Sequence, residues 1–266
     1  MMPQDFRRAQ AEICRKLAGR QVMLGVDYDG TLAPFAARPE QARLAPAVRR
    51  VLRQCAALPR VRLAVVSGRP LADLRRRVAI PDISYAGDHG WCIQTPQGAY
   101  TRKLSPAIAQ ALVAVERCLR RVCADIPGVL IEGKLFSVAL HYRAVAAQRR
   151  RTVRSCFQHC IRPWREQGML ETLEGALVRE ARPARPWNKG HAVRWLWRQS
   201  GIPPRERVAV YIGDDRTDED VFRILRESDV GIVVGRQKRS GAQYCVETQA
   251  EVIEVLRMFA RETMRR

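Results

Sequence analysis

The sequence predicts an α/β fold with a parallel sheet, because short apolar runs alternate with stretches of helical periodicity near both ends of the chain. In the first third, three apolar runs have the length of buried strands: 22–26, 61–66 and 83–86. The helical stretches that connect or follow them are 46–57 and 71–78. Strands separated by helices favour parallel pairing, with helices on both faces of the sheet.

The last third repeats this alternation of helices and strands. Helices are expected at residues 189–199, 218–227 and 250–261, and strands at 208–212 and 230–234. We therefore expect the two ends of the chain to form one Rossmann-like parallel-sheet core.

The middle of the chain follows a different order. The expected elements are a helix at 106–124, an extended segment at 129–142, a helix at 146–162, and extended segments at 169–174 and 176–182. This order is typical of an α/β cap domain inserted into the sheet domain. We therefore expect core segments at 1–94 and 183–266 around a cap at 95–182, with hinges at Thr95–Gly98 and in the Pro-rich segment 182–186.

The composition is that of a globular protein with a large excess of basic residues. The chain has 266 residues and a formal net charge of +20 at pH 7. The basic residues are spread along expected helices without interleaved aromatic residues, which favours solvated helix faces over a specific nucleic-acid site. No uncharged apolar stretch is long enough to span a bilayer, and no apolar secretory core follows the basic N-terminal segment. We expect a cytoplasmic monomer that attracts small anions, with neither a specific nucleic acid nor a membrane as a partner.

The eight cysteines show no Cys-x-x-Cys pair and no zinc-ligand spacing with histidine. Cys156 and Cys160 are four residues apart in an expected helix, where they can share a face. We expect free thiols in a reducing compartment and no disulfide framework.

The most informative local motif is Asp-Tyr-Asp-Gly-Thr, which directly follows the apolar run at 22–26. Two carboxylates one residue apart at the end of a buried strand can perform nucleophilic phosphoryl transfer. Asp27 would attack phosphorus, and Asp29 would protonate the leaving oxygen and later activate water. Gly30 permits the turn, and Thr31 offers a hydroxyl and a backbone N–H to phosphate oxygens. The alternative interpretation is an acidic turn that closes a strand.

Two further polar residues are expected at the same edge of the sheet, because functional groups of a doubly wound sheet collect at the carboxyl ends of its strands. Ser67 follows the strand at 61–66, where its hydroxyl could hold a phosphoryl oxygen or cap a turn. Lys189 begins a helix, where its ammonium group and backbone N–H groups could bind phosphate together.

The acidic segment 214–220 follows the strand at 208–212. Its five carboxylates in seven residues repel one another unless a cation or a helix N-terminus compensates their charge. Hard carboxylate and phosphate oxygens with no nearby His or Cys cluster favour Mg²⁺, and Asp214, next to the strand, is the best candidate ligand. A purely structural acidic helix start is the alternative.

The order Asp-x-Asp, Ser, Lys, Gly-Asp-Asp resembles that of the haloacid dehalogenase-like phosphatases. The resemblance implies that Asp27 is the nucleophile and a Mg²⁺ ligand, and that Asp29 is the acid/base and binds Mg²⁺ through its backbone carbonyl. It also implies that Ser67 and Lys189 hold the phosphoryl group. The remaining metal-site residues that it implies are Asp214 as the third ligand, and Asp215 and Asp218 to orient metal waters and Lys189.

Further segments make the chain similar to the trehalose-6-phosphate phosphatase family. These segments are residues 87–90, 132–134, 141–143, 180–183 and 213–220. One departure is Asp88, where the family usually has Asn before His-Gly. The resemblance implies Mg²⁺-dependent hydrolysis of a small-molecule sugar phosphate, trehalose 6-phosphate, through an aspartyl-phosphate intermediate. The substrate-binding residues that it implies are Thr31, Arg69, His89, Glu132, Lys134, His141, Arg143 and Glu180.

The alternation of side chains along 136–143 supports a cap that binds sugar, because one face of this strand is apolar and the other carries His141 and Arg143. The apolar face would pack on the cap helices. Whether 132–134 continues this strand or precedes a hairpin stays open. The competing functions are a related capped phosphatase for sucrose phosphate or a hexose phosphate, and a non-catalytic anion-binding relative.

Overall fold

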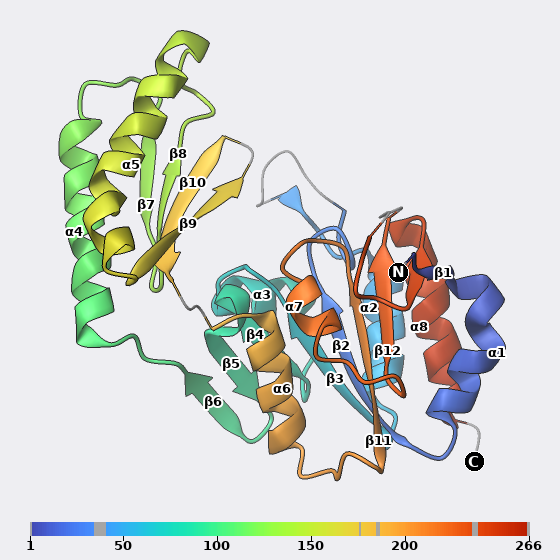
Figure 1. The fold of residues 1–266 in the computed structure, drawn as a ribbon. Helices are drawn as coiled ribbons and strands as arrows, with labels where there is room; N and C mark the ends of the chain where they lie inside the picture. Colours follow the sequence, from blue (N-terminus) through green and yellow to red (C-terminus); the bar gives the residue numbers. More distant parts are fainter. Residues whose placement is uncertain (1, 35–40, 176, 185–186, 236–238, 265–266) are drawn as a thin grey trace. The chain divides into compact units, whose positions relative to one another are not determined.

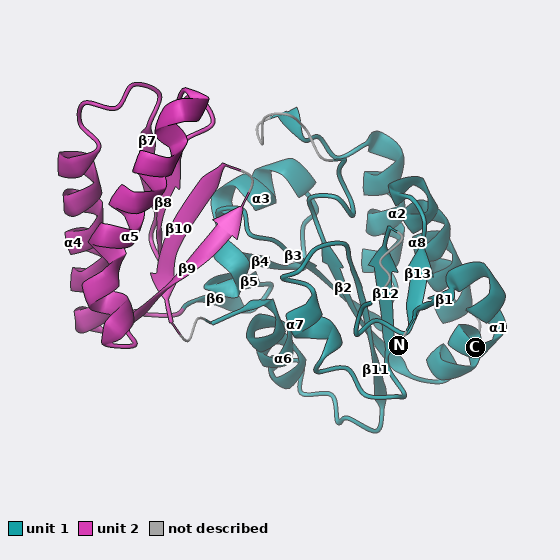
Figure 2. Cartoon of the chain, turned by 45° about the horizontal axis from the view of Figure 1, so that its top comes forward, with its two compact units in different colours: residues 1–101, 187–266 teal, residues 102–186 magenta. Residues whose placement is uncertain are grey.

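The computed structural model describes residues 2–34, 41–175, 177–184, 187–235 and 239–264. The chain divides into two compact units (Figure 2): residues 1–101 with 187–266, and residues 102–186. The boundaries expected at 94/95 and 182/183 therefore lie a few residues before those of the two units. The hinge expected at Thr95–Gly98 is wrong, because these residues belong to a hairpin of the core sheet. Residues 185–186 of the other expected hinge lie outside the described residues.

The core unit contains a nine-stranded sheet among its described residues (Figure 1). In spatial order its strands are β1 (Gln4–Asp5), β13 (Tyr244–Val246), β12 (Val230–Val234), β11 (Arg207–Gly213), β2 (Gln21–Asp27), β3 (Val61–Val66), β4 (Ser84–Gly87), β5 (Cys92–Thr95) and β6 (Gly98–Thr101). The strands from β1 to β4 pair in parallel, whereas β5 and β6 are antiparallel additions at one edge. The parallel sheet expected from the sequence is confirmed, and its central strands β2 and β11 come from opposite ends of the chain.

Helices cover both faces of this sheet. In chain order they are α1 (Phe6–Leu17), α2 (Pro46–Ala56), α3 (Leu71–Val78), α6 (Lys189–Gln199), α7 (Glu219–Phe222) and α8 (Gln249–Met264). Alternate residues of β2 enter different cores: Leu24 packs in a cluster with α1, α2, α3 and α8, and Met23 in a cluster with α6 and α7. This alternation is what a strand covered on both faces requires. Of the described helices, none combines the length and the apolar character that crossing a bilayer demands.

Most expected elements of the core are present within one or two residues, but one helix is wrong. The helix expected at 218–227 ends at Phe222, and a turn fixed by Asp229 replaces its second half. The Asp229 carboxylate accepts hydrogen bonds from the Arg226 N–H (2.8 Å), the Arg226 guanidinium (2.9 and 3.0 Å) and the Ala209 N–H (2.9 Å). These contacts hold the chain after Phe222 against β11, so the helix does not continue.

The second unit is the α/β cap expected from the sequence. Its elements are α4 (Pro106–Val122), β7 (Leu130–Gly133), β8 (Val138–His141), α5 (Arg150–Glu166), β9 (Leu170–Gly175) and β10 (Val178–Pro183). The strands form an antiparallel sheet in the order β7-β8-β10-β9, and its core residues pack with α4 and α5. The question left open at 132–134 is settled: Gly133 pairs with Val138, and the Lys134 N–H donates to the Ser137 carbonyl (2.8 Å), so a hairpin joins β7 to β8.

The cap also corrects the expectation for the cysteines. Cys118 of α4 and Cys160 of α5 form a disulfide, with their Cα atoms 5.7 Å apart. The six other cysteines are free, as expected. The two bonded residues lie on different helices, so only the packing of α4 on α5 brings them together.

Candidate active site

A buried ion pair joins the end of β2 to the start of α6. Asp27 and Lys189 are 3% and 2% exposed, and the Lys189 ammonium group donates to Asp27 Oδ1 (2.7 Å) and to Asp218 Oδ1 (2.8 Å). The side chain of Asn188 caps α6 by accepting a hydrogen bond from the His191 N–H (2.9 Å). This cap fixes the direction of the helix start, and Lys189 with it.

Burial and neighbouring charges together shift the pKa values of this pair. Burial alone would lower the pKa of Lys189, but the carboxylates of Asp218 and Asp27 outweigh it and raise that pKa well above its ordinary value. Burial raises the pKa of Asp27, Lys189 opposes this rise, and the carboxylates of Asp218 and Asp214 add to it. Lys189 therefore stays positively charged. The carboxylates around it carry more negative charge than this one cation neutralises.

Asp218 accepts hydrogen bonds from four groups of the site. Its Oδ1 accepts from Lys189 and from the Tyr211 hydroxyl (2.7 Å), and its Oδ2 accepts from the backbone N–H groups of Asp214 and Asp215 (3.0 Å each). These four contacts use the acceptor positions of an ionised carboxylate. Asp218 thus orients Lys189 and the loop after β11, and has little capacity left for a ligand of its own.

Tyr211 is a site residue that the sequence analysis missed. Its ring is buried, and a Cβ atom on Gly25, its neighbour across β2 and β11, would stand 2.8 Å from Tyr211 Cδ2. Glycine at position 25 therefore makes the space that the tyrosine ring occupies. A lone glycine inside a buried strand is the sequence signal for such a close approach.

Three carboxylates form a group that could hold a metal ion. Asp27, Asp214 and Asp218 each have a carboxylate oxygen within 4.8 Å of the others, although the oxygens of Asp218 already accept four hydrogen bonds. Thr31 Oγ1 donates to Asp214 Oδ1 (2.8 Å), and burial raises the pKa of Asp214 to about 6. The donors are all hard oxygen atoms, and Lys189 alone does not balance their charge, so the group fits a hard divalent cation.

Asp215 lies beside this group, but its carboxylate stabilises the backbone turn that follows it. Its Oδ1 accepts from the N–H (2.8 Å) and hydroxyl (2.7 Å) of Thr217 and from the Asp218 N–H (3.1 Å). Burial would raise the pKa of Asp215, but Lys189 and the hydrogen bonds from Thr217 outweigh it and lower the pKa to about 2. Asp215 therefore stays ionised and closes the turn that leads to α7.

Asp29, the expected acid/base, is held by Arg69. The Arg69 guanidinium binds both oxygens of Asp29 (2.6 and 2.7 Å), also donates to Asp73 (3.1 Å), and lies 5.3 Å from the centre of the Tyr28 ring. Arg69 was expected to contact substrate, and here it orients the Asp29 carboxylate. A bidentate arginine–carboxylate pair fixes both the position and the plane of the carboxylate.

Ser67 and His89 lie together at the end of β3. Asp27 pairs with Val66, so Ser67 is one residue beyond the level of the Asp27 backbone. The buried Ser67 hydroxyl accepts from the Arg69 N–H (3.1 Å), and the Ser67 carbonyl accepts from the His89 N–H (3.0 Å). Both residues therefore shape the loop beside Asp27.

The departure at Asp88 has a structural reason. Asp88 and His89 both have positive φ angles (53° and 54°), a conformation that Asp tolerates. The Asp88 N–H donates to the Arg69 carbonyl (2.7 Å), and Asp88 Oδ2 accepts from the Leu71 N–H (3.3 Å) at the start of α3. A carboxylate at this helix N-terminus is favourable, so Asp88 can brace the loop in place of Asn.

Four of the expected sugar-binding residues gather on one face of the cap sheet. His141 Nε2 lies 3.0 Å from Glu132 Oε2, and the Lys134 ammonium group lies 3.5 Å from Glu180 Oε1 and 4.0 Å from Glu132 Oε2. The Ser137 hydroxyl also donates to Glu180. Val138 and Leu140 of β8 pack with the helices, so this polar cluster lies on the face opposite α4 and α5.

Arg143 is not brought into that cluster. It follows β8 in an exposed turn, and its carbonyl accepts from Arg150 (3.3 Å). Within the described part of the chain its side chain contacts no member of the cluster.

Comparisons with known proteins agree with this fold. A haloacid dehalogenase-like hydrolase from B. subtilis has a similar fold, with a TM-score of 0.58 at 14% identity over 88% of this chain and 98% of that chain. The chain therefore shares the fold of this hydrolase. A family model described as trehalose-phosphatase matches residues 25–251, so the chain belongs to the trehalose-phosphatase family.

Individual relatives support the same family. The trehalose-phosphate phosphatase of Mycobacterium tuberculosis is 35% identical over 256 residues, which are 92% of this chain and 63% of that protein. An uncharacterised glycosyl hydrolase of the same species is 34% identical over 96% of this chain, but only 19% of its own length is matched. The chain thus spans less than two thirds of these relatives.

A solved structure covers nearly the whole chain. The trehalose-6-phosphate phosphatase of Aspergillus fumigatus has a TM-score of 0.71 at 25% identity over 98% of this chain and 99% of that chain. The C-terminal domain of the trehalose-6-phosphate phosphatase of C. albicans shares the fold, with a TM-score of 0.77 at 21% identity and the same coverage.

Proposed function

We propose that the chain hydrolyses trehalose 6-phosphate to trehalose and phosphate. The observation that carries this proposal is the buried Lys189 ammonium group between Asp27 and Asp218, beside the oxygens of Asp27 and Asp214. Such a site combines a nucleophile, a fixed positive charge and a cation site at one edge of the sheet. The trehalose-phosphatase family model and the named relatives support the choice of substrate.

The metal of this proposal is Mg²⁺. The carboxylates of Asp27 and Asp214 and the backbone carbonyl of Asp29 would hold it, because the acceptor positions of Asp218 are already used. When bound, Mg²⁺ would neutralise charge on the phosphoryl oxygens. Asp215 would orient metal-bound waters in addition to stabilising the turn before α7.

The reaction would proceed in two steps on Asp27. Its carboxylate attacks phosphorus and an aspartyl-phosphate forms, while Asp29 gives a proton to the leaving sugar oxygen. Asp29 then takes a proton from a water molecule that hydrolyses the intermediate. Lys189, with Ser67 and Thr31, would bind the phosphoryl oxygens throughout. Asp29 has to exchange its contact with Arg69 for the leaving oxygen, so Arg69 would return it to one position after each turnover.

The cap would select the sugar. Glu132, Lys134, His141 and Glu180 form a cluster of charged and polar groups that can accept from and donate to sugar hydroxyls. Arg143 and His89 remain expected substrate contacts from the family resemblance. Sugar binding at this cluster would separate the choice of substrate from the chemistry at Asp27.

A phosphate-release panel tests the proposal. Purified protein with Mg²⁺ is assayed on trehalose 6-phosphate, sucrose phosphate and glucose 6-phosphate, with the Asp27→Asn variant as the inactive control. We expect the fastest turnover with trehalose 6-phosphate and loss of activity with a strong chelator. Preference for sucrose phosphate or a hexose phosphate would assign a related capped phosphatase. No turnover of any ester would leave a non-catalytic anion-binding protein.

A further inference from the structure

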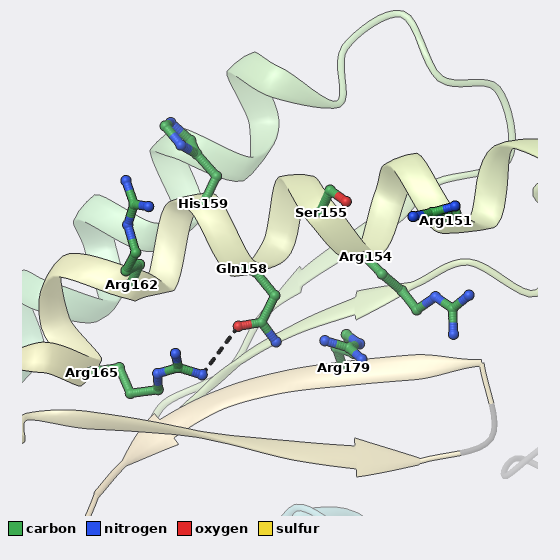
Figure 3. A pocket seen from close by; sticks show the side chains of 8 residues that line it. All are labelled: Arg151, Arg154, Ser155, Gln158, His159, Arg162, Arg165 and Arg179. Carbon is green, nitrogen blue, oxygen red and sulfur yellow. Dashed lines mark hydrogen bonds between the residues drawn. The ribbon is translucent and has the colours of Figure 1, made fainter.

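A groove on the cap is lined by several arginine side chains that have no part in the proposed phosphatase site. It has a volume of about 610 Å³ and is lined by Arg151, Arg154, Arg162 and Arg165 of α5 and by Arg179 of β10 (Figure 3). All its lining residues lie within the cap unit, so the groove is complete without the core.

One side of α5 supplies most of this groove. The lining positions from 151 to 165 recur at intervals of one or three residues, which places them along one face of the helix over about 21 Å. The opposite face of α5 buries Val153, Phe157 and Ile161 in the cap core. The groove residues are therefore not needed to fill that core.

The charges of the groove are poorly balanced. No acidic residue lines it, and the side chains of Arg151, Arg154 and Arg162 make no hydrogen bond or ion pair with any other described residue. Arg165 donates to Gln158 (3.3 Å), and only Arg179 has an acidic partner, Glu174 (2.8 Å).

The dipole of α5 adds to this excess of positive charge. The first turn of α5 contains no acidic residue but holds Arg150 and Arg151, at the end where the helix dipole disfavours positive charge. Repulsion along this face would be relieved by a bound anion.

The lining defines what kind of anion fits. Guanidinium groups bind phosphoryl oxygens as planar forks, and a groove of this volume holds a small molecule. His159 is the only ring among the lining residues, so there is no platform of aromatic side chains on which nucleic-acid bases would stack. No large apolar side chain lines the groove, which disfavours insertion into a membrane.

We propose that this groove is a binding site for a small anion that carries several phosphoryl groups, separate from the phosphatase site. The ligand class is a linear oligophosphate or another multiply phosphorylated small molecule. Arg154 and Arg162, two turns apart on the exposed face, are its central contacts.

Inorganic tripolyphosphate is the probe for this site. Its binding is measured by titration calorimetry at about 0.15 M salt, without divalent cations so that chelation does not contribute. The test variant is Arg154→Gln/Arg162→Gln. The matched control is Arg117→Gln/Arg121→Gln, which removes the same charge from two exposed residues of α4 in the same unit.

We expect the groove variant to bind tripolyphosphate about tenfold more weakly than the wild type, and the control to bind like the wild type. Both variants should keep the thermal stability and the basal phosphate release of the wild type. Absence of binding by the wild type, or an equal loss in both variants, would overturn the proposal. A short DNA duplex or an anionic lipid vesicle whose binding depends on Arg154 and Arg162, while tripolyphosphate binding does not, would replace the small ligand with a macromolecular surface.

Discussion

Two polar clusters of this protein differ in their burial and in the lengths of their side-chain contacts. In the core, Asp27, Lys189 and Asp218 are buried and each side chain has fixed partners at 2.7–2.8 Å. In the cap, Glu132 and Lys134 are 50% and 38% exposed in their side chains, and their ion pair is 4.0 Å long. The core cluster is fixed before any ligand arrives, whereas the cap cluster can exchange its partners for sugar hydroxyls. Substitutions in the core should therefore affect every substrate, and those in the cap only substrates that carry the sugar.

The largest effect is expected for Asp27→Asn. This variant keeps the size of the side chain but removes the proposed nucleophile and one negative charge of the proposed metal site, so turnover should fall by about a thousandfold or more. The loss should be equal on trehalose 6-phosphate and on p-nitrophenyl phosphate. Thermal unfolding of the variant provides the control for folding. Activity close to that of the wild type would refute the mechanism.

Tyr211→Phe should have the next largest effect. It removes the hydroxyl that binds Asp218 but keeps the ring that fills the space above Gly25. Because a hydrogen bond to a charged group contributes roughly 1.5–3 kcal/mol, we expect kcat to fall by about tenfold or more with little change in KM.

A matched control for Tyr211→Phe is Tyr244→Phe. This substitution removes a hydroxyl that binds Glu12 on α1 (2.7 Å), outside the phosphatase site. If both variants lost activity equally, or if Tyr211→Phe changed only thermal stability, Tyr211 would have no positioning part in catalysis.

Glu132→Ala separates the two clusters most directly. Turnover of trehalose 6-phosphate should fall by about tenfold, because the variant loses a hydrogen bond to the sugar that would be buried in the complex, at a cost of roughly 1–3 kcal/mol. Turnover of p-nitrophenyl phosphate should change little, since this ester carries no sugar. Glu166→Ala, an exposed residue at the end of α5, is the control. An equal loss on both substrates would assign Glu132 to the folding or movement of the cap instead.

The smallest expected effect concerns stability at low pH. Burial would raise the pKa of Asp73, but hydrogen bonds from Arg77, Arg76 and Arg69 outweigh it and lower the pKa to about 2. Because this pKa is lower than in the unfolded chain, the carboxylate stabilises the fold fully above about pH 4, and its contribution is lost as the pH falls through about 2.

Asp73→Asn tests this dependence. At neutral pH we expect a loss of about 1 kcal/mol or less in the free energy of unfolding, because the ion pairs are partly exposed to solvent. The difference from the wild type should shrink toward zero near pH 2, as measured by urea unfolding at both pH values. A difference that stays constant with pH would show that the charge of Asp73 does not contribute.

The sequence was sufficient for features that depend on local order along the chain. Strands β2, β3 and β11 follow from apolar runs of the right length, and parallel pairing places the residues after them at one edge. Asp27, Ser67 and Asp214 could therefore be assigned to one site before the structure was known, and so could Lys189 at the start of α6.

Features that depend on packing between distant segments could not be found in this way. The disulfide between Cys118 and Cys160 requires α4 to pack on α5, and no spacing within either helix indicates it. Arg69 was assigned to substrate because nothing in its own segment shows that it lies on Asp29. The end of α7 at Phe222 depends on the Asp229 carboxylate, which accepts hydrogen bonds from Ala209 of the distant strand β11 and from Arg226 of the same turn.

The close approach of Gly25 and Tyr211 has a consequence for redesign and for divergence of the chain. Gly25 cannot be varied alone, since any side chain there collides with the aromatic ring, and position 211 alone accepts only another aromatic residue, because a smaller one leaves a void against the bare backbone. A library that randomises them together and selects for folding should recover alternative small–large pairs, whereas libraries that randomise them separately should return only glycine at 25 and aromatic residues at 211.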